Sequence, residues 1–159
     1  FGYWRPNNLK QVETRGIEVN TEWEQIDTKV TKVLSLNYSY TSSVNQEKEH
    51  EFDESNGKQL IYIPLHKGNV SFNSTFKTYS ISMNHQFVGE RFISSDNEEN
   101  LPLYQLFDIS FTKEFALKSN HISVTFGVKN LLDTEYQAIE WRPMPNRNYF
   151  LKLNYQFTK

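Results

Sequence analysis

The stretch NVSFNSTFKTYSISMNHQF (residues 69–87) decides the fold class of this chain. Apolar side chains recur there at every second position, as Val70 and Phe72 before a Lys-Thr pair and as Ile81 and Met83 after it. The positions between them hold mostly Ser and Asn. Alternation with a period of two is typical of a half-buried β-strand, and two polar residues between such runs suit a tight turn. The stretch therefore predicts a β-hairpin with one apolar and one polar face.

The same alternation recurs along the rest of the 159 residues and predicts an all-β fold. No stretch shows a good helical stripe. The aromatic share of 15% and the many Ser, Thr and Asn residues also favour strands over helices. The seven expected strands cover residues 15–23, 32–40, 69–76, 79–87, 107–115, 122–128 and 149–157.

The connections between the expected strands alternate between short and long. Short connections are expected around residues 26–29, 77–78 and 116–120, and long ones separate the other neighbouring strands. Membrane β-barrels have this asymmetry, with tight turns on the periplasmic side and long loops on the outside. Soluble meanders rarely keep it. The pattern therefore favours an antiparallel transmembrane β-barrel segment over a soluble sandwich.

The two faces of the expected strands differ in the same sense. Burying an unpaired amide or carboxylate costs on the order of 1–3 kcal/mol, so the polar face is expected to line a wet lumen. Its members include Glu18, Asn37, Ser39, Asn73, Asn84, Gln86, Asp108, Asn154 and Gln156. The lipid-facing set is Ile17, Val19, Leu34, Leu36, Phe72, Ile81, Met83, Ile109, Phe111, Val124, Phe126, Leu151 and Leu153. His85 falls on this apolar face as an anomaly. Aromatic residues near strand ends fit interfacial girdles, namely Trp23, Tyr40, Tyr79, Phe115, Tyr155 and Phe157.

Several short motifs follow one another along the chain. They are Arg-Gly-Ile-Glu at residues 15–18, residues 87–92 with the Leu-Pro-Leu-Tyr of 101–104, and Asn-Leu-Leu-Asp-Thr-Glu-Tyr at 130–136. Taken in order, they resemble an early barrel strand, a later block and the strand-then-loop motif of the TonB-dependent outer-membrane receptor family. Pro-Asn-Arg-Asn-Tyr at 145–149 resembles the lead into its final strand, although Asn146 stands where the family usually has Gly. Asn tolerates left-handed backbone angles, so this turn is expected to survive.

The resemblance implies that residues 1–159 are the C-terminal part of such a receptor, about the last seven strands of a 22-stranded barrel. The plug domain and the earlier strands would be missing, and residues 1–10 would end an outer loop. Expected partners are the remainder of the receptor, the lipid bilayer with its lipopolysaccharide, and TonB through the missing N-terminal part. The expected location is the bacterial outer membrane. The whole receptor would bind a scarce nutrient, such as an iron chelate (siderophore) or a vitamin B12-type compound.

Two other functions stay open on the sequence alone. A small autonomous membrane barrel, acting as an adhesin or structural protein, needs an even number of strands. A soluble lipocalin-like carrier predicts an apolar interior and folding without detergent. No nucleic-acid partner is expected at a net charge of −2, and no cofactor or enzyme activity is expected, because motifs for nucleophiles or phosphate loops are absent. The histidines lack metal-binding spacing; His50 in its acidic run suits a solvated loop better than a cation site.

Ligand contact is expected in the loop over residues 133–148. Tyr136, Trp141 and Arg142 are the candidate ligand-binding residues, because aromatic rings give broad contact and a guanidinium pairs with anions. Two prolines would stiffen this loop and reduce the ordering cost of binding. For Arg147 we favour an anchoring role in the turn before the last strand. The acidic loop at residues 47–57 is the weaker candidate.

Overall fold

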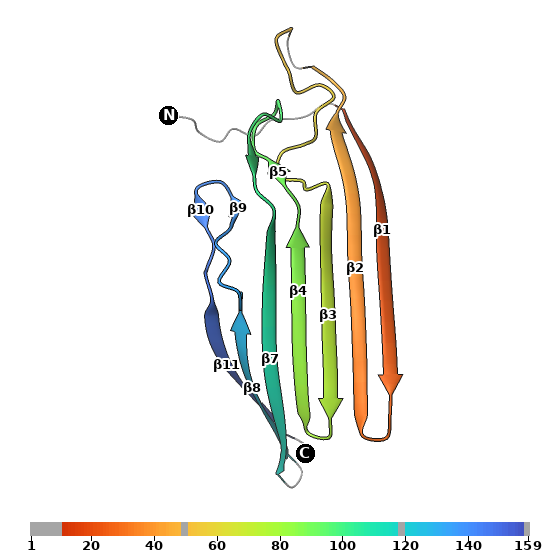
Figure 1. Cartoon of the computed structure of the whole chain (residues 1–159), viewed down its shortest axis with the longest axis vertical. Helices are drawn as coiled ribbons and strands as arrows, with labels where there is room; N and C mark the ends of the chain where they lie inside the picture. Colours follow the sequence, from red (N-terminus) through yellow and green to blue (C-terminus); the bar gives the residue numbers. More distant parts are fainter. Residues whose placement is uncertain (1–10, 49–50, 118–119, 158–159) are drawn as a thin grey trace.

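A computed structural model describes residues 11–48, 51–117 and 120–157 of the chain. Seven long strands form one antiparallel sheet in the order β1-β2-β3-β4-β7-β8-β11 (Figure 1). Their bounds are β1 Val12–Ile26, β2 Val30–Asn45, β3 His66–Phe76, β4 Tyr79–Val88, β7 Tyr104–Leu117, β8 Asn120–Lys129 and β11 Asn148–Gln156. Each expected strand is confirmed, and most extend a few residues beyond the expected range. The loop end expected at residues 1–10 and the histidine His50 lie outside the described residues.

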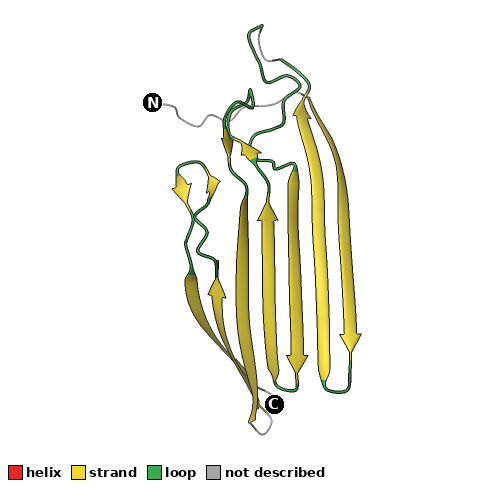
Figure 2. Ribbon diagram, viewed as in Figure 1, coloured by secondary structure: helices red, strands yellow, loops and turns green. Residues whose placement is uncertain are grey.

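The long connections lie together at one end of the sheet and the short turns at the other (Figures 1 and 2). The β1–β2 and β3–β4 turns are short, and Lys77 adopts the left-handed conformation, with φ of 55°, in the second of them. Two of the long connections contain small two-stranded ribbons that the sequence did not predict, because strands of two or three residues show no periodicity. These are β5 Arg91–Phe92 with β6 Asn100–Leu101, and β9 Gln137–Ile139 with β10 Arg142–Pro143.

The strand register brings the predicted apolar positions onto one continuous face. Neighbouring strands pair residue by residue without a shift, so one row crosses the whole sheet. That row runs Trp23, Leu34, Phe72, Met83, Ile109, Val128 and Tyr149. The next row holds His85, whose Nε2 donates to Gln105 Oε1 at 2.9 Å and whose ring stacks on Phe107 with 4.4 Å between centroids. The anomalous histidine thus has its polar partner on the same face.

Within the described residues the sheet is a single layer, with no second layer against its apolar face (Figure 2). Only Val88, Leu101 and Val128 are buried hydrophobic side chains among the described residues. Large residues such as Ile17, Phe126 and Leu151 stay between 51% and 73% exposed. A soluble domain normally buries a sheet face against another layer. This chain therefore needs something outside itself to cover the apolar face. No helix within the described ranges is long and apolar enough to span a membrane.

Candidate functional site

The three predicted ligand residues lie in and beside the β9–β10 ribbon, and the structure does not bring them together. Trp141 occupies the turn of the ribbon, is 83% exposed and has φ of 61°. Its backbone N–H donates to Gln137 Oε1 at 2.8 Å, which closes the turn. Arg142 is exposed on β10. Tyr136 precedes β9 and packs its ring against Tyr104, with 4.5 Å between centroids.

A cavity of about 500 Å³, here called the loop cavity, lies next to Tyr136. This volume is within the range of small-molecule sites, roughly 300–1,000 Å³. Tyr136 lines the cavity, whereas Trp141 and Arg142 do not. Its walls come from the connection before β7 and from the last long connection. The lining residues are Leu101, Pro102, Glu135, Tyr136, Gln137, Pro143, Met144 and Asn146.

The chemistry of the loop cavity is mixed. Glu135 offers a carboxylate, and the amides of Gln137 and Asn146 offer both donors and acceptors, while the prolines and Met144 give apolar contact. Burial raises the pKa of Tyr136, and the nearby Tyr104 and Asp108 raise it further. The Tyr136 hydroxyl therefore remains a protonated donor at neutral pH. Such a lining suits a ligand with both polar and apolar parts.

Arg91 connects the two walls of the loop cavity by hydrogen bonds to a backbone carbonyl of each. It belongs to β5, is 4% exposed, and donates to Pro102 O at 3.3 Å and to Gln137 O at 3.0 Å. Its guanidinium also lies 4.8 Å from the centroid of the Tyr104 ring. Burial lowers the pKa of Arg91, partly opposed by Tyr104, and within the described residues its Nε has no hydrogen-bond partner. Arg91 thus clamps the β9–β10 ribbon to the preceding connection.

Asn130 and Asp133 build the start of the last long connection. Asn130 is 4% exposed and left-handed, with φ of 50°; its Nδ2 donates to Thr134 O at 2.8 Å and its Oδ1 accepts from Thr134 N at 2.9 Å. Asp133 Oδ1 accepts from Arg147 N, and Arg147 Nε donates to Leu131 O at 2.9 Å. Arg147 therefore anchors the turn, as the sequence interpretation favoured. Asn146 does not adopt the left-handed conformation, so its tolerance for those angles is not used here.

The first two long connections are also tied together. Asn97 Oδ1 accepts from the backbone N–H of Gln59 at 2.8 Å, and Asn97 Nδ2 donates to Gln59 O at 2.9 Å. The Gln59 side chain in turn accepts from Ser43 N at 2.8 Å, at the end of β2. Hydrogen bonds from Ser94 and from the backbone of Glu98 to the Asp96 carboxylate lower the pKa of Asp96. Together with Arg91, these contacts link all three long connections into one rim.

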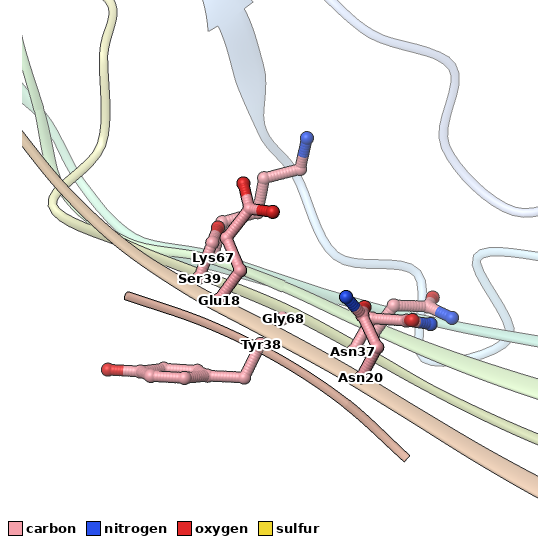
Figure 3. Close-up of a pocket in the computed structure, with 8 residues that line it drawn as sticks. Glu18, Asn20, Asn37, Tyr38, Ser39, Lys67 and Gly68 are labelled. Atoms are coloured by element: carbon pink, nitrogen blue, oxygen red, sulfur yellow. The ribbon is translucent and has the colours of Figure 1, made fainter. Parts of the chain in front are cut away.

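The polar face of the sheet carries a shallow hollow of about 220 Å³ (Figure 3). Glu18, Ser39 and Lys67 project from one side of the sheet, with Asn20 and Asn37 beside them, whereas Tyr38 projects from the opposite side (Figure 3). Strand register explains this grouping, because Asn20, Asn37 and Asn69 are direct cross-strand neighbours. The hollow offers the amide donors and acceptors of this row together with the opposite charges of Glu18 and Lys67, which suits contact with a polar surface or solvent.

Of the three predicted residues only Tyr136 lines the loop cavity, and sequence reasoning did not single out Arg91, Gln59 or Asn97. These three residues bond mainly to backbone atoms, which leave no side-chain signal in a sequence. The left-handed φ of 62° at Asn97 is the one feature that an Asn in a turn would have indicated. The ligand roles of Tyr136, Trp141 and Arg142, and that of the loop at residues 47–57, stay predictions.

The sequence and the fold of this chain are similar to those of known proteins. A family model described as "TonB dependent receptor-like, beta-barrel" matches residues 1–131. The ferric preacinetobactin receptor BauA from Acinetobacter baumannii has a TM-score of 0.70 at 12% identity over 92% of the chain. The ferric citrate transporter FecA in unliganded form has a TM-score of 0.69 at 14% identity over 91%. The ferric yersiniabactin uptake receptor FyuA from Yersinia pestis has 0.59 at 18% over 90%. The chain spans 27%, 28% and 22% of these structures, about a quarter of their length, and the likeness at such identities shows the fold.

Proposed function

Because the chain belongs to the TonB-dependent receptor-like β-barrel family, whose members are receptors and transporters rather than enzymes, we propose that it forms part of the wall and outer rim of an outer-membrane nutrient receptor. The whole receptor binds a scarce nutrient at its outer loops and imports it with energy delivered through TonB. It resides in the outer membrane of a Gram-negative bacterium. In this arrangement the long connections face the outside and the short turns face the periplasm.

The observation that carries the proposal is the uncovered apolar face. Ile17, Phe126 and Leu151 are exposed in a single-layer sheet whose other face is polar, so lipid on one side and a wet lumen on the other satisfy both faces. The free sides of β1 and β11 add to this argument. Unpaired strand groups in lipid cost several kcal/mol each, so both edge strands require neighbours.

We place residues 1–159 as the C-terminal part of the receptor, about the last seven strands of a 22-stranded barrel. The plug domain and the other strands are then further segments of the same receptor, and TonB is reached through the part beyond this chain. The polar hollow lies on the face that turns toward the lumen and the plug. An autonomous barrel is disfavoured because seven strands is an odd number for such barrels. A lipocalin-like carrier is disfavoured because the large apolar side chains lie on an uncovered face.

The nutrient class we propose is an iron chelate, with vitamin B12-type compounds as the second candidate. The three similar structures are described as receptors or transporters of ferric preacinetobactin, ferric citrate and ferric yersiniabactin. The mixed lining of the loop cavity, with Glu135 and amides beside Met144 and prolines, supports an organic chelate with polar and apolar parts. The ligand residues we propose are Tyr136, Trp141 and Arg142.

Growth assays test this proposal. A strain that lacks the full-length receptor gene is supplied with single iron sources of the citrate, catecholate, hydroxamate and phenolate type, and separately with cobalamin. Loss of growth on one ferric chelate, restored by the intact gene, is the expected result. Growth loss only on cobalamin would replace the iron chelate by the second candidate. Normal growth on every source would overturn the transport function.

A further inference from the structure

The apolar face carries a second hollow, here called the aromatic slot, directly behind the polar hollow. Its volume is about 390 Å³, and almost all of its lining is apolar. Gly68 forms the floor, while Tyr38 and Phe87, its two cross-strand neighbours, form the walls. Leu36 and Val70 close the end toward the middle of the sheet. Figure 3 shows Tyr38 pointing away from the polar residues, and Tyr38 lines the slot on that opposite face.

The backbone does not require glycine at position 68. A Cβ atom there would lie 3.4 Å from Asn37 O and 3.8 Å from Tyr38 Cδ2, which is ordinary contact, and its φ is not left-handed. At Gly16, by contrast, a Cβ would meet Tyr40 O at 2.6 Å. Glycine in the interior of a strand weakens it and often marks the close approach of another molecule. The slot is therefore the feature that glycine at this position preserves.

The two histidines beside the slot already have hydrogen-bond partners. His85 Nε2 donates to Gln105 Oε1, and the Tyr38 hydroxyl and His66 Nδ1 share a hydrogen bond of 2.8 Å. His66 also packs against Tyr40, with 5.2 Å between centroids, at the end of the slot nearest the long connections. Rings with polar tips favour the level where lipid headgroups begin. The slot thus runs inward from that level.

We propose that the aromatic slot holds an acyl chain of an anionic lipid in the outer leaflet. The slot is continuous with the apolar face that meets lipid in the proposed function, on which this inference rests. Arg15 lies on the same face, beyond the Ile17–Tyr40–His66 row; it pairs with Glu13 and keeps 79% of its side chain exposed. A cation at this height suits the phosphate of a headgroup whose chain enters the slot.

Photo-crosslinking in vesicles tests the slot. The full-length receptor is reconstituted in phosphatidylglycerol that carries a diazirine on one acyl chain, and the labelled residues are mapped by mass spectrometry. Gly68→Leu fills the slot, and Ser74→Leu is the matched control, because it adds the same side chain on the same strand and face away from the slot. The expected result is labelling of Tyr38 and Phe87 that falls about tenfold in Gly68→Leu, equivalent to about 1.4 kcal/mol. Ser74→Leu keeps the wild-type labelling.

Gly68→Ala, which the backbone accommodates, replaces the leucine variant if that variant fails to insert, and a smaller but measurable fall in labelling is expected. Labelling of Tyr38 and Phe87 that is equal in wild type and both Gly68 variants would overturn the slot while leaving the membrane function intact. If no residue of the apolar face reacted with lipid, the proposed membrane function itself would fail.

Discussion

Replacing Arg91 with Met is expected to release the β9–β10 ribbon without unfolding the sheet. Arg91 donates hydrogen bonds to three carbonyl oxygens, but only the bond to Gln137 O at 3.0 Å reaches the ribbon. The bonds to Gly89 O and Pro102 O and the cation–π contact with Tyr104 hold the guanidinium in place within its own connection and against β7. A hydrogen bond from a charged donor contributes about 2 kcal/mol. The clamp is therefore expected to stabilise the ribbon by about 2 kcal/mol, or a factor of about 30 in the equilibrium constant for its opening.

Hydrogen–deuterium exchange in the full-length receptor measures this opening. Amides of residues 137–144 are expected to exchange about 30-fold faster in Arg91→Met, with the amides of β3 and β4 unchanged. Arg91→Lys is expected to fall between the two, because a single ammonium cannot reproduce the forked geometry of the guanidinium. Lys152→Met, which removes a positive charge from exposed β11, is the control. Equal protection of the ribbon in Arg91→Met and the control would refute the clamp.

Three further outcomes are expected. In cysteine scanning of the full-length receptor, a lipid-soluble reagent is expected to label positions 36 and 126 and to spare position 37; the reverse pattern would mean an apolar interior. Trp141→Ala and Arg142→Ala are expected to weaken nutrient binding tenfold or more, about 1.4 kcal/mol, at normal surface abundance, and unchanged uptake would remove both residues from the site. Residues 1–159 alone are expected to aggregate in detergent, because β1 and β11 leave their outer edges unpaired; a monomeric, heat-resistant barrel would contradict this.

The seven long strands were predictable because in each of them apolar and polar residues alternate over several successive pairs of residues. The two ribbons were not, because Arg91–Phe92 and Arg142–Pro143 are too short to show alternation. His85 looked anomalous in the sequence, since its partner Gln105 becomes a neighbour only through the pairing of β4 with β7. Side-chain positions that depend on register across distant strands cannot be inferred from local pattern.

The candidate site was predictable only in part, for a related reason. The sequence singled out the aromatic and charged residues of the last connection, and the structure places Tyr136 at a cavity but Trp141 at an exposed turn. Local composition identifies residues that suit a ligand, whereas the cavity is formed by contact with Leu101 and Pro102 from an earlier connection. Arg91 belongs to the family-like stretch 87–92, but no local pattern indicates that its guanidinium reaches the last long connection.

The linked rim has a consequence for binding. Long connections that move independently would each have to be ordered when a nutrient binds, and ordering them reduces affinity. Here Asn97 joins the first two connections, and Arg91 joins the second to the third. Because the connections are already ordered in the folded rim, less conformational entropy is lost when a nutrient binds. The Arg91 clamp is also the joint with the least compensated charge, because its carbonyl partners are neutral. If the rim opens to release or admit a nutrient, the β9–β10 ribbon is the part that we expect to open first, and Trp141 at its turn is carried with it.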